Sequence, residues 1–194
     1  MKTRKLTVTA MLAAVATVLM LFSFPLPSFM PGFIKMDFSE LPALLASFAF
    51  GPWYGVLVCL VKNIINAFFT TTGGVGEFSN FLLGAVFSGT AGLIYQKKRT
   101  LSGALVGSLA GTLAMAVIGI FTNYFVVYPV YAKLMPMDAI VKMYQAINPN
   151  VTDLWTALIY MNFPFTLVKG AGNAALTFIL YKRLSPLFFG KRKQ

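Results

Sequence analysis

Long stretches of apolar residues restrict most strongly what this chain can fold into. Several of them reach roughly 18 residues, the length at which an apolar run is read as a transmembrane helix. The mean hydropathy is +0.76, and only 11% of the 194 residues are charged, whereas soluble chains carry about a quarter charged residues. We therefore predict an all-α integral membrane protein, in which residues 1–194 form a single membrane domain.

Prolines and polar loops divide the apolar runs into six predicted transmembrane helices. The first run is long enough to span a bilayer, which favours a retained helix over a cleaved signal peptide. Asp37 is a candidate N-cap of the short second helix, and Glu40, three residues later, would complete a capping box. Pro129 is expected to interrupt the fifth helix and Pro164 to kink the sixth. The predicted helices are Leu6–Phe24, a short helix within 37–50, Trp53–Phe69, Phe78–Tyr95, Leu101–Tyr128 and Leu154–Leu184.

The 16 Lys and Arg residues, against 5 Asp and Glu, gather largely in patches beside the apolar runs. The basic patches lie at residues 2–5, 97–99, 182–183 and 191–193. Cytoplasmic segments of membrane proteins carry such an excess of basic residues. Six crossings place all these patches on one side, so both termini are predicted to be cytoplasmic. Residues 25–38 then form an outer lid loop, and residues 132–153 an outer loop between the fifth and sixth helices. No basic patch lies on a polar, foldable surface, which argues against nucleic acid as a partner.

Catalytic and metal-binding chemistry is poorly represented in this composition. The chain has no histidine, which is the commonest general base and metal ligand. Its one cysteine, Cys59, excludes an internal disulfide. The five acidic residues are scattered among loops and helix starts. The sequence therefore predicts no metal site, no resident cofactor and no enzymatic activity.

Polar side chains within the predicted spans are the strongest indication of a binding site. Thr166 and Lys169 share one face of the last helix, and Asn162 lies one turn earlier. A lysine in mid-membrane costs at least about 2.5–3.5 kcal/mol on insertion scales, so this stripe is expected to face protein or water. Lys169 either pairs with a carboxylate or offers its donors to a bound solute. We favour the second interpretation, in which the ammonium meets a neutral, carbonyl-rich ring rather than an acid.

Small residues mark possible helix-packing faces. Ala10 and Ala14 lie one turn apart on the first helix, and Gly103, Gly107 and Gly111 repeat this spacing on the fifth. Such spacing lets two helices approach closely in a membrane. By itself the pattern fits packing within the protein as well as docking onto another membrane subunit.

Longer motifs make the chain resemble a known family. The stretches "DFSELP", "VKN", "GGVGEFSN", "NYFVVYP" and "LVKGAGN" together resemble the riboflavin-specific substrate-binding (S) component of energy-coupling factor (ECF) transporters. The likeness covers nearly the whole chain. It implies six helices with both termini inside, one vitamin bound near the outer face, and assembly with a transmembrane coupling subunit and two cytoplasmic ATPases. It also implies that Ala10 and Ala14 contact the coupling subunit.

The resemblance further implies which residues hold the ligand. Asn123 and Lys169 match the positions that hold the flavin ring, while Thr166 stands where the family pattern has asparagine; Asn162, one turn earlier, is a candidate substitute. The complete set of predicted substrate-binding residues is Asp37, Phe38, Leu41, Lys62, Asn66, Glu77, Asn80, Asn123, Tyr128, Asn162, Thr166 and Lys169.

The expected function is capture of riboflavin, or its phosphate FMN, at the plasma membrane of a bacterium. ATP hydrolysis is expected in the partner subunits. Two alternatives stay open on sequence grounds: an S component for another vitamin, such as pantothenate or thiamine, and a stand-alone secondary carrier or channel. An intramembrane enzyme is disfavoured because histidine and clustered acids are missing.

Overall fold

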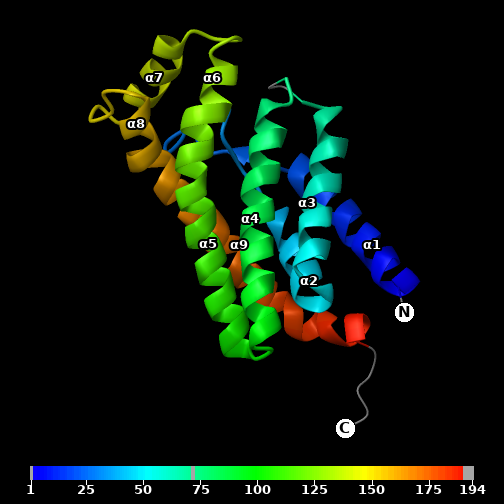
Figure 1. The fold of residues 1–194 in the computed structure, drawn as a ribbon. Helices are drawn as coiled ribbons and strands as arrows, with labels where there is room; N and C mark the ends of the chain where they lie inside the picture. The colour runs from blue at the N-terminus through cyan, green and yellow to red at the C-terminus, as the bar shows by residue number, and fades with distance from the viewer. Residues whose placement is uncertain (1, 71–72, 190–194) are drawn as a thin grey trace.

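The computed structural model describes residues 2–70 and 73–189 and is a helical bundle (Figure 1). Its long helices are α1 (Lys2–Leu21), α3 (Pro52–Ala67), α4 (Val75–Lys97), α5 (Leu101–Thr122) and α9 (Phe163–Phe189). The shorter helices are α2 (Glu40–Phe50), α6 (Tyr128–Tyr131), α7 (Met137–Gln145) and α8 (Leu154–Ala157). Two π-helical turns, η1 (Asn123–Val127) and η2 (Leu158–Asn162), join α5 to α6 and α8 to α9. The described part of the chain is thus mostly helical, as predicted, and a short pair of strands is its one departure from the all-α prediction.

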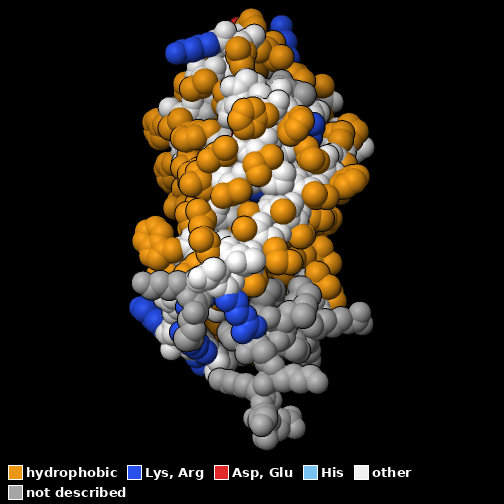
Figure 2. All heavy atoms as spheres, turned by 90° about the vertical axis from the view of Figure 1, so that its right-hand side faces the viewer, with side chains coloured by type: hydrophobic (Ala, Val, Ile, Leu, Met, Phe, Trp, Pro, Cys, Tyr) orange, Lys and Arg blue, Asp and Glu red, His pale blue; other side chains and the backbone are white. Residues whose placement is uncertain are grey.

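Within the described part of the chain, four helical segments are long and apolar enough to cross a membrane: Thr3–Leu21, Val75–Lys97, Leu101–Tyr131 and Leu154–Leu180. The other two predicted spans are shorter, with 11 residues in α2 and 16 in α3. At 1.5 Å per residue these reach only about 16 and 24 Å, less than the roughly 30 Å of a bilayer core. Figure 2 shows hydrophobic side chains covering the middle of the molecule, with Lys and Arg near its two ends.

One end of the bundle carries the beginning of α1, the turn between α4 and α5, and the end of α9 (Figure 1). The basic patch Lys97–Arg99 lies in that turn. Residues 191–193, the last predicted basic patch, fall outside the described residues. The opposite end is built from the segment between α1 and α2, where β1 (Phe24–Pro25) pairs antiparallel with β2 (Lys35–Met36), and from α7.

A single apolar cluster closes this opposite end. Met30 from the β1–β2 loop is buried together with Ile140 and Tyr144 of α7 and with Leu158 of η2. The predicted outer loop at 132–153 therefore contains a helix, α7, which packs against the predicted lid segment. Burial of this apolar surface holds α7 and the β1–β2 loop together.

The predicted capping box of the second helix is wrong. Ser39 occupies the N-cap position of α2 in a right-handed helical conformation and makes no side-chain cap bond. Asp37 instead accepts bonds from the backbone N–H of Ser39, at 2.9 Å, and from its hydroxyl. Glu40 turns into the bundle, where it is 1% exposed. Neither acid therefore forms the reciprocal bonds of a capping box.

Pro129 does not interrupt the fifth helix as predicted, because helical structure continues from Leu101 to Tyr131. A proline ring clashes with the carbonyl four residues earlier in an α-helix. For Pro129 and Pro164 that carbonyl belongs to Phe125 and Tyr160, which lie in η1 and η2. The wider π-helical turn before each proline accommodates the ring, and such turns recur at functional sites.

Candidate substrate-binding site

A cavity of about 290 Å³ lies toward the end of the bundle opposite the termini. This volume is near the lower limit of small-molecule sites, roughly 300–1,000 Å³. Its wall combines the end of α1, the β1–β2 segment, the beginning of α4, and the π-helical turns with the start of α9. The two proline-associated turns therefore border the cavity directly, through Asn123 and Asn162.

The structure brings together most of the predicted site residues. The cavity is lined by Asp37, Asn66, Glu77, Asn80, Asn123, Tyr128, Asn162, Thr166 and Lys169. Phe38, Leu41 and Lys62 do not line it. Leu41 packs in the core between α1, α2 and α3, and Phe38 lies next to Gly172 of α9. The assignment of roles to these residues stays a prediction.

Lys169 has an acidic partner, so the expectation of an ammonium without one is wrong. Its Nζ lies 2.7 Å from Asp37 Oδ2, and the two side chains are 13% and 4% exposed. Asn173, one turn along α9, donates to the backbone carbonyl of Asp37 at 3.2 Å. Asp37 is the one acceptor recorded for this ammonium among the described residues. An ammonium has three donors, which leaves hydrogens for a ligand in the adjacent cavity.

Asp37 stays ionised despite its burial. Desolvation raises the pKa of its carboxyl, but the charges of Lys169 and Lys62 and the hydrogen bonds from Lys169 and Ser39 outweigh it. The pKa of Asp37 is therefore held well below its ordinary value of 3.8. The pair with Lys169 carries no net charge, which keeps this wall of the cavity suited to a neutral ligand.

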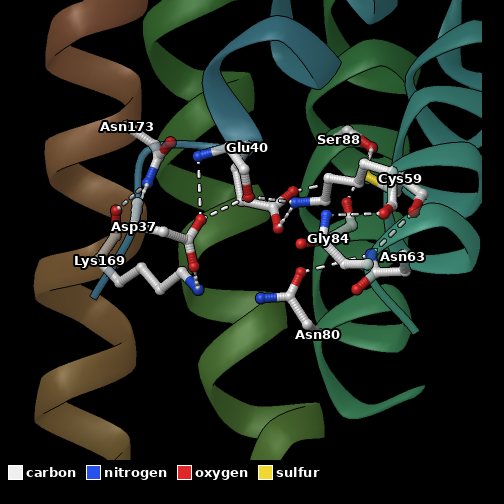
Figure 3. Close-up of polar contacts among 12 residues, drawn as sticks. Asp37, Glu40, Cys59, Asn63, Asn80, Gly84, Ser88, Lys169 and Asn173 are labelled. Atoms are coloured by element: carbon white, nitrogen blue, oxygen red, sulfur yellow. Dashed lines mark hydrogen bonds and ion pairs between the residues drawn. The ribbon is translucent and has the colours of Figure 1, made fainter. Parts of the chain in front are cut away.

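A second ion pair lies beside the first (Figure 3). Lys62 Nζ lies 2.6 Å from Glu40 Oε1, and the two side chains are 0% and 2% exposed. Lys62 also donates to the Ser39 hydroxyl at 2.6 Å, and that hydroxyl donates to Asp37. A continuous hydrogen-bond chain thus runs from α9 through the segment before α2 to α3. It continues weakly to Cys59, whose Sγ is 3.4 Å from Glu40 Oε2.

Gly84 of α4 makes room for this second pair. A Cβ added there would lie 2.4 Å from Glu40 Oε2 and 2.7 Å from Oε1. No side chain fits at such distances unless the carboxylate moves. The close approach of α4 to Glu40 explains a glycine at this position, where helix propensity alone would disfavour it.

The glycine-rich turn before α4 brings further polar groups to the cavity. Glu77 accepts a hydrogen bond from the Thr70 hydroxyl at 2.8 Å, which ties the end of α3 to the first turn of α4. Asn80 Oδ1 accepts a bond of 3.4 Å from Asn63 of α3. Asn66 donates to the Lys62 carbonyl at 3.0 Å. Helices α3 and α4 therefore present one carboxylate and two amides to the cavity, and these hydrogen bonds hold all three side chains in place.

The two π-helical turns present the remaining amides. Asn123 Oδ1 accepts a hydrogen bond of 3.2 Å from Ser79 of α4. Asn162 Oδ1 accepts one of 2.7 Å from the Tyr144 hydroxyl of α7, and the hydroxyls of Tyr128 and Tyr144 also contact each other. These partners orient each amide before any ligand arrives.

Sequence reasoning missed several of these residues. Ser79, Phe33 and Phe165 line the cavity, and Tyr144 supports it from behind. Ser79 stands in the matched "GGVGEFSN" stretch, next to the predicted Asn80, so the motif offered a signal for it. For Tyr144, within a polar loop sequence, no signal was available.

The cavity wall is suited to a planar, uncharged ligand with polar edges. Amides and hydroxyls offer both donors and acceptors, and Lys169 adds donors. Apolar and aromatic side chains supply the stacking surface. They are Met20, Leu21, Phe33, Ile34, Phe69, Leu83, Met115, Val127, Tyr128, Tyr131 and Phe165.

A bundle of apolar helices with a cavity lined by both polar and aromatic side chains near one end is typical of a small-molecule binding component of a membrane system. The family model described as ECF transporter, substrate-specific component, matches residues 4–181. The chain therefore belongs to the substrate-specific components of ECF transporters, as its motifs predicted.

Similar proteins agree with this assignment. The riboflavin transporter RibU of Staphylococcus aureus (strain TCH60) is 35% identical over 94% of this chain and 90% of its own length. The riboflavin transporter FmnP of Bacillus subtilis (strain 168) is 30% identical over 96% and 94%. A solved structure described as the S component of a bacterial ECF transporter superposes with a TM-score of 0.79. It is 33% identical and covers 97% of this chain and 99% of the solved one.

Proposed function

We propose that this chain captures riboflavin in the cavity between α1, α4 and α9 and delivers it to an ECF transport complex. The cavity wall supports this proposal most strongly, because four amides and the Lys169–Asp37 ion pair border a space flanked by aromatic rings. The isoalloxazine ring of riboflavin is planar and uncharged, with carbonyl and nitrogen acceptors and one N–H donor. Each of these finds a complementary group type in the cavity wall.

The membrane arrangement proposed here has six crossings, with both termini in the cytoplasm of a bacterium and the cavity toward the outside. The common position of the beginning of α1, the basic α4–α5 turn and the end of α9 supports it (Figure 1). The short helices α2 and α3 are then two of the six crossings. The segment at residues 25–38 acts as the lid over the entrance.

Partner docking is assigned to α1. Ala10 and Ala14 are exposed on this helix, whereas Ala13 and Ala16 are buried against the bundle. Small exposed residues one turn apart leave a surface on which another membrane helix can approach closely. We assign this surface to the transmembrane coupling subunit, with two ATPases on the cytoplasmic side.

Riboflavin binding is tested with the purified chain in detergent. We expect a yellow preparation with the visible absorption of an oxidised flavin, and one-to-one quenching of riboflavin fluorescence on titration of the flavin-free protein. FMN, pantothenate and thiamine are titrated in parallel. Binding of one of these vitamins without riboflavin would assign the chain to another substrate. In vesicles, uptake is expected only with the coupling subunit, the ATPases and ATP; ion-driven uptake by the chain alone would indicate a secondary carrier.

A further inference from the structure

Tyr144 is buried at the outer end of the bundle yet does not line the cavity. It belongs to α7 and is 0% exposed. Its ring contacts Phe33 of the lid segment edge-on, with ring centroids 6.3 Å apart. Its hydroxyl reaches Asn162 Oδ1 at 2.7 Å. A residue outside the cavity thus holds a cavity amide through its one polar group.

With Asn162 Oδ1 placed toward Tyr144, the direction of each hydrogen bond follows from counting protons. A tyrosine hydroxyl has a single hydrogen, and that of Tyr144 is donated to Asn162 Oδ1. The contact between the two tyrosine hydroxyls is therefore donated by Tyr128. The Tyr128 oxygen in turn accepts from Asn162 Nδ2 at 3.4 Å. The three side chains thus form a closed ring, in which each donates one hydrogen bond to the next and accepts one from the previous.

This ring limits what Asn162 can offer to the cavity, because it occupies one lone pair of the oxygen and one amide hydrogen. Its carbonyl oxygen is bonded to Tyr144, and one hydrogen of its amide nitrogen is directed to Tyr128. One N–H remains uncommitted on a residue that borders the cavity. Without the Tyr144 hydroxyl, Asn162 Oδ1 loses its hydrogen-bond donor, and the amide is held only through the 3.4 Å bond from its nitrogen to Tyr128.

We propose that Tyr144 is a positioning residue that makes Asn162 an N–H donor for an acceptor atom on the edge of the ligand ring. Asn162 thereby supplies the amide contact that Thr166, with its hydroxyl, does not supply. The identity of the ligand rests on the function proposed above, whereas the orientation of the amide does not. The outer helix α7 therefore contributes to ligand recognition from outside the binding cavity.

The test is a double-mutant cycle with riboflavin in detergent. Tyr144→Phe keeps the ring against Phe33 and removes only the hydroxyl; we expect about tenfold weaker binding, the size of one hydrogen bond. Asn162→Ala is expected to weaken binding by at least as much. The double variant should bind no more weakly than Asn162→Ala, because Tyr144 acts through that amide. Tyr160→Phe, in the same π-helical turn but 56% exposed, is the matched control and should leave the affinity unchanged.

Unchanged affinity in Tyr144→Phe would overturn the proposal. So would an equal loss in the presence and absence of Asn162, since the effect would then come from packing. A second readout needs no ligand: the side-chain amide signals of Asn162 in nuclear magnetic resonance, identified by their loss in Asn162→Ala. They should shift and exchange faster with solvent in Tyr144→Phe but not in Tyr160→Phe, and identical signals would refute the orientation.

The two readouts separate the two levels of the proposal. If the chain binds no flavin, the proposed function is wrong. The role of Tyr144 is then tested by the Asn162 amide signals alone. If Tyr144→Phe fails to fold, hydrogen exchange of the Asn162 amide in the unaltered chain decides. Slow exchange of one N–H agrees with the ring of hydrogen bonds, and fast exchange of both contradicts it.

Discussion

Two buried ion pairs lie side by side in this protein, and their surroundings give them different roles. Lys62 and Glu40 are 0% and 2% exposed and join α3 to α2; Glu40 also borders the cavity, but Lys62 does not. Lys169 and Asp37 are 13% and 4% exposed, and both border the cavity. The hydroxyl of Ser39 connects the pairs, because it accepts from Lys62 and donates to Asp37.

The comparison separates a lysine used for structure from one available to a ligand. The Lys62 ammonium is enclosed by protein groups and does not reach the cavity. The Lys169 ammonium faces the cavity, where a ligand can accept its remaining hydrogens. A buried charge whose partner is removed is strongly destabilising, whereas one beside a polar cavity can recover hydration. The same substitution should therefore reduce mainly the stability of the fold at Lys62 and mainly the affinity for the ligand at Lys169.

Replacing Lys62 by methionine is expected to cause the largest loss of stability. Methionine keeps much of the side-chain length, but Glu40 is left buried without its counter-charge, which costs about 3–5 kcal/mol. Thermal unfolding in detergent, followed by loss of soluble protein, measures this effect. The double variant Lys62→Met/Glu40→Gln should recover part of the loss, because it removes the unpaired charge. A single variant as stable as the unaltered chain would show that the inner pair is not structural.

Replacing Lys169 by methionine should instead act mainly on binding. A hydrogen bond that involves a charged group contributes about 1.5–3 kcal/mol, which corresponds to a roughly 10- to 100-fold weaker affinity for riboflavin. The loss of stability should be smaller than for Lys62→Met, because water in the cavity can solvate Asp37. Titration of riboflavin fluorescence measures the affinity, and thermal unfolding supplies the control. Unchanged affinity would remove Lys169 from the proposed contacts.

The local pattern of the sequence was sufficient to find one side of the site. Thr166 and Lys169 share a helix face, and a lysine within an apolar run predicts an interior partner or cavity. Its actual partner, Asp37, lies 132 residues away along the chain, and no local pattern connects them. The spacing of Asp37 and Glu40 is a capping signature, so the local interpretation concealed their longer-range contacts.

Other features depend on geometry that hydrophobic periodicity does not encode. A π-helical turn adds one residue to a helix, and the apolar pattern before Pro129 and Pro164 is too uniform to reveal it. Tyr144 lies in a polar stretch that predicts a loop, and only the packed fold places its hydroxyl on Asn162. The motifs predicted the family, the main helices and much of the cavity wall. They could not predict the supporting contacts, which join distant segments.

The smallest expected effect is that of pH on the two ion pairs. The pKa of Asp37 is lowered from 3.8, so its contribution to stability is present above that value and is lost only as the pH falls through the lower, folded-state pKa. The chain has no histidine, the side chain whose ordinary pKa would change its charge between pH 5 and 8. Riboflavin affinity and thermal stability should therefore be nearly constant over this interval. Asp37→Asn, which cannot titrate, is the matched control: a pH dependence that this variant abolished would show that Asp37 gains a proton within the interval and that its ion pair with Lys169 is weaker than the geometry indicates.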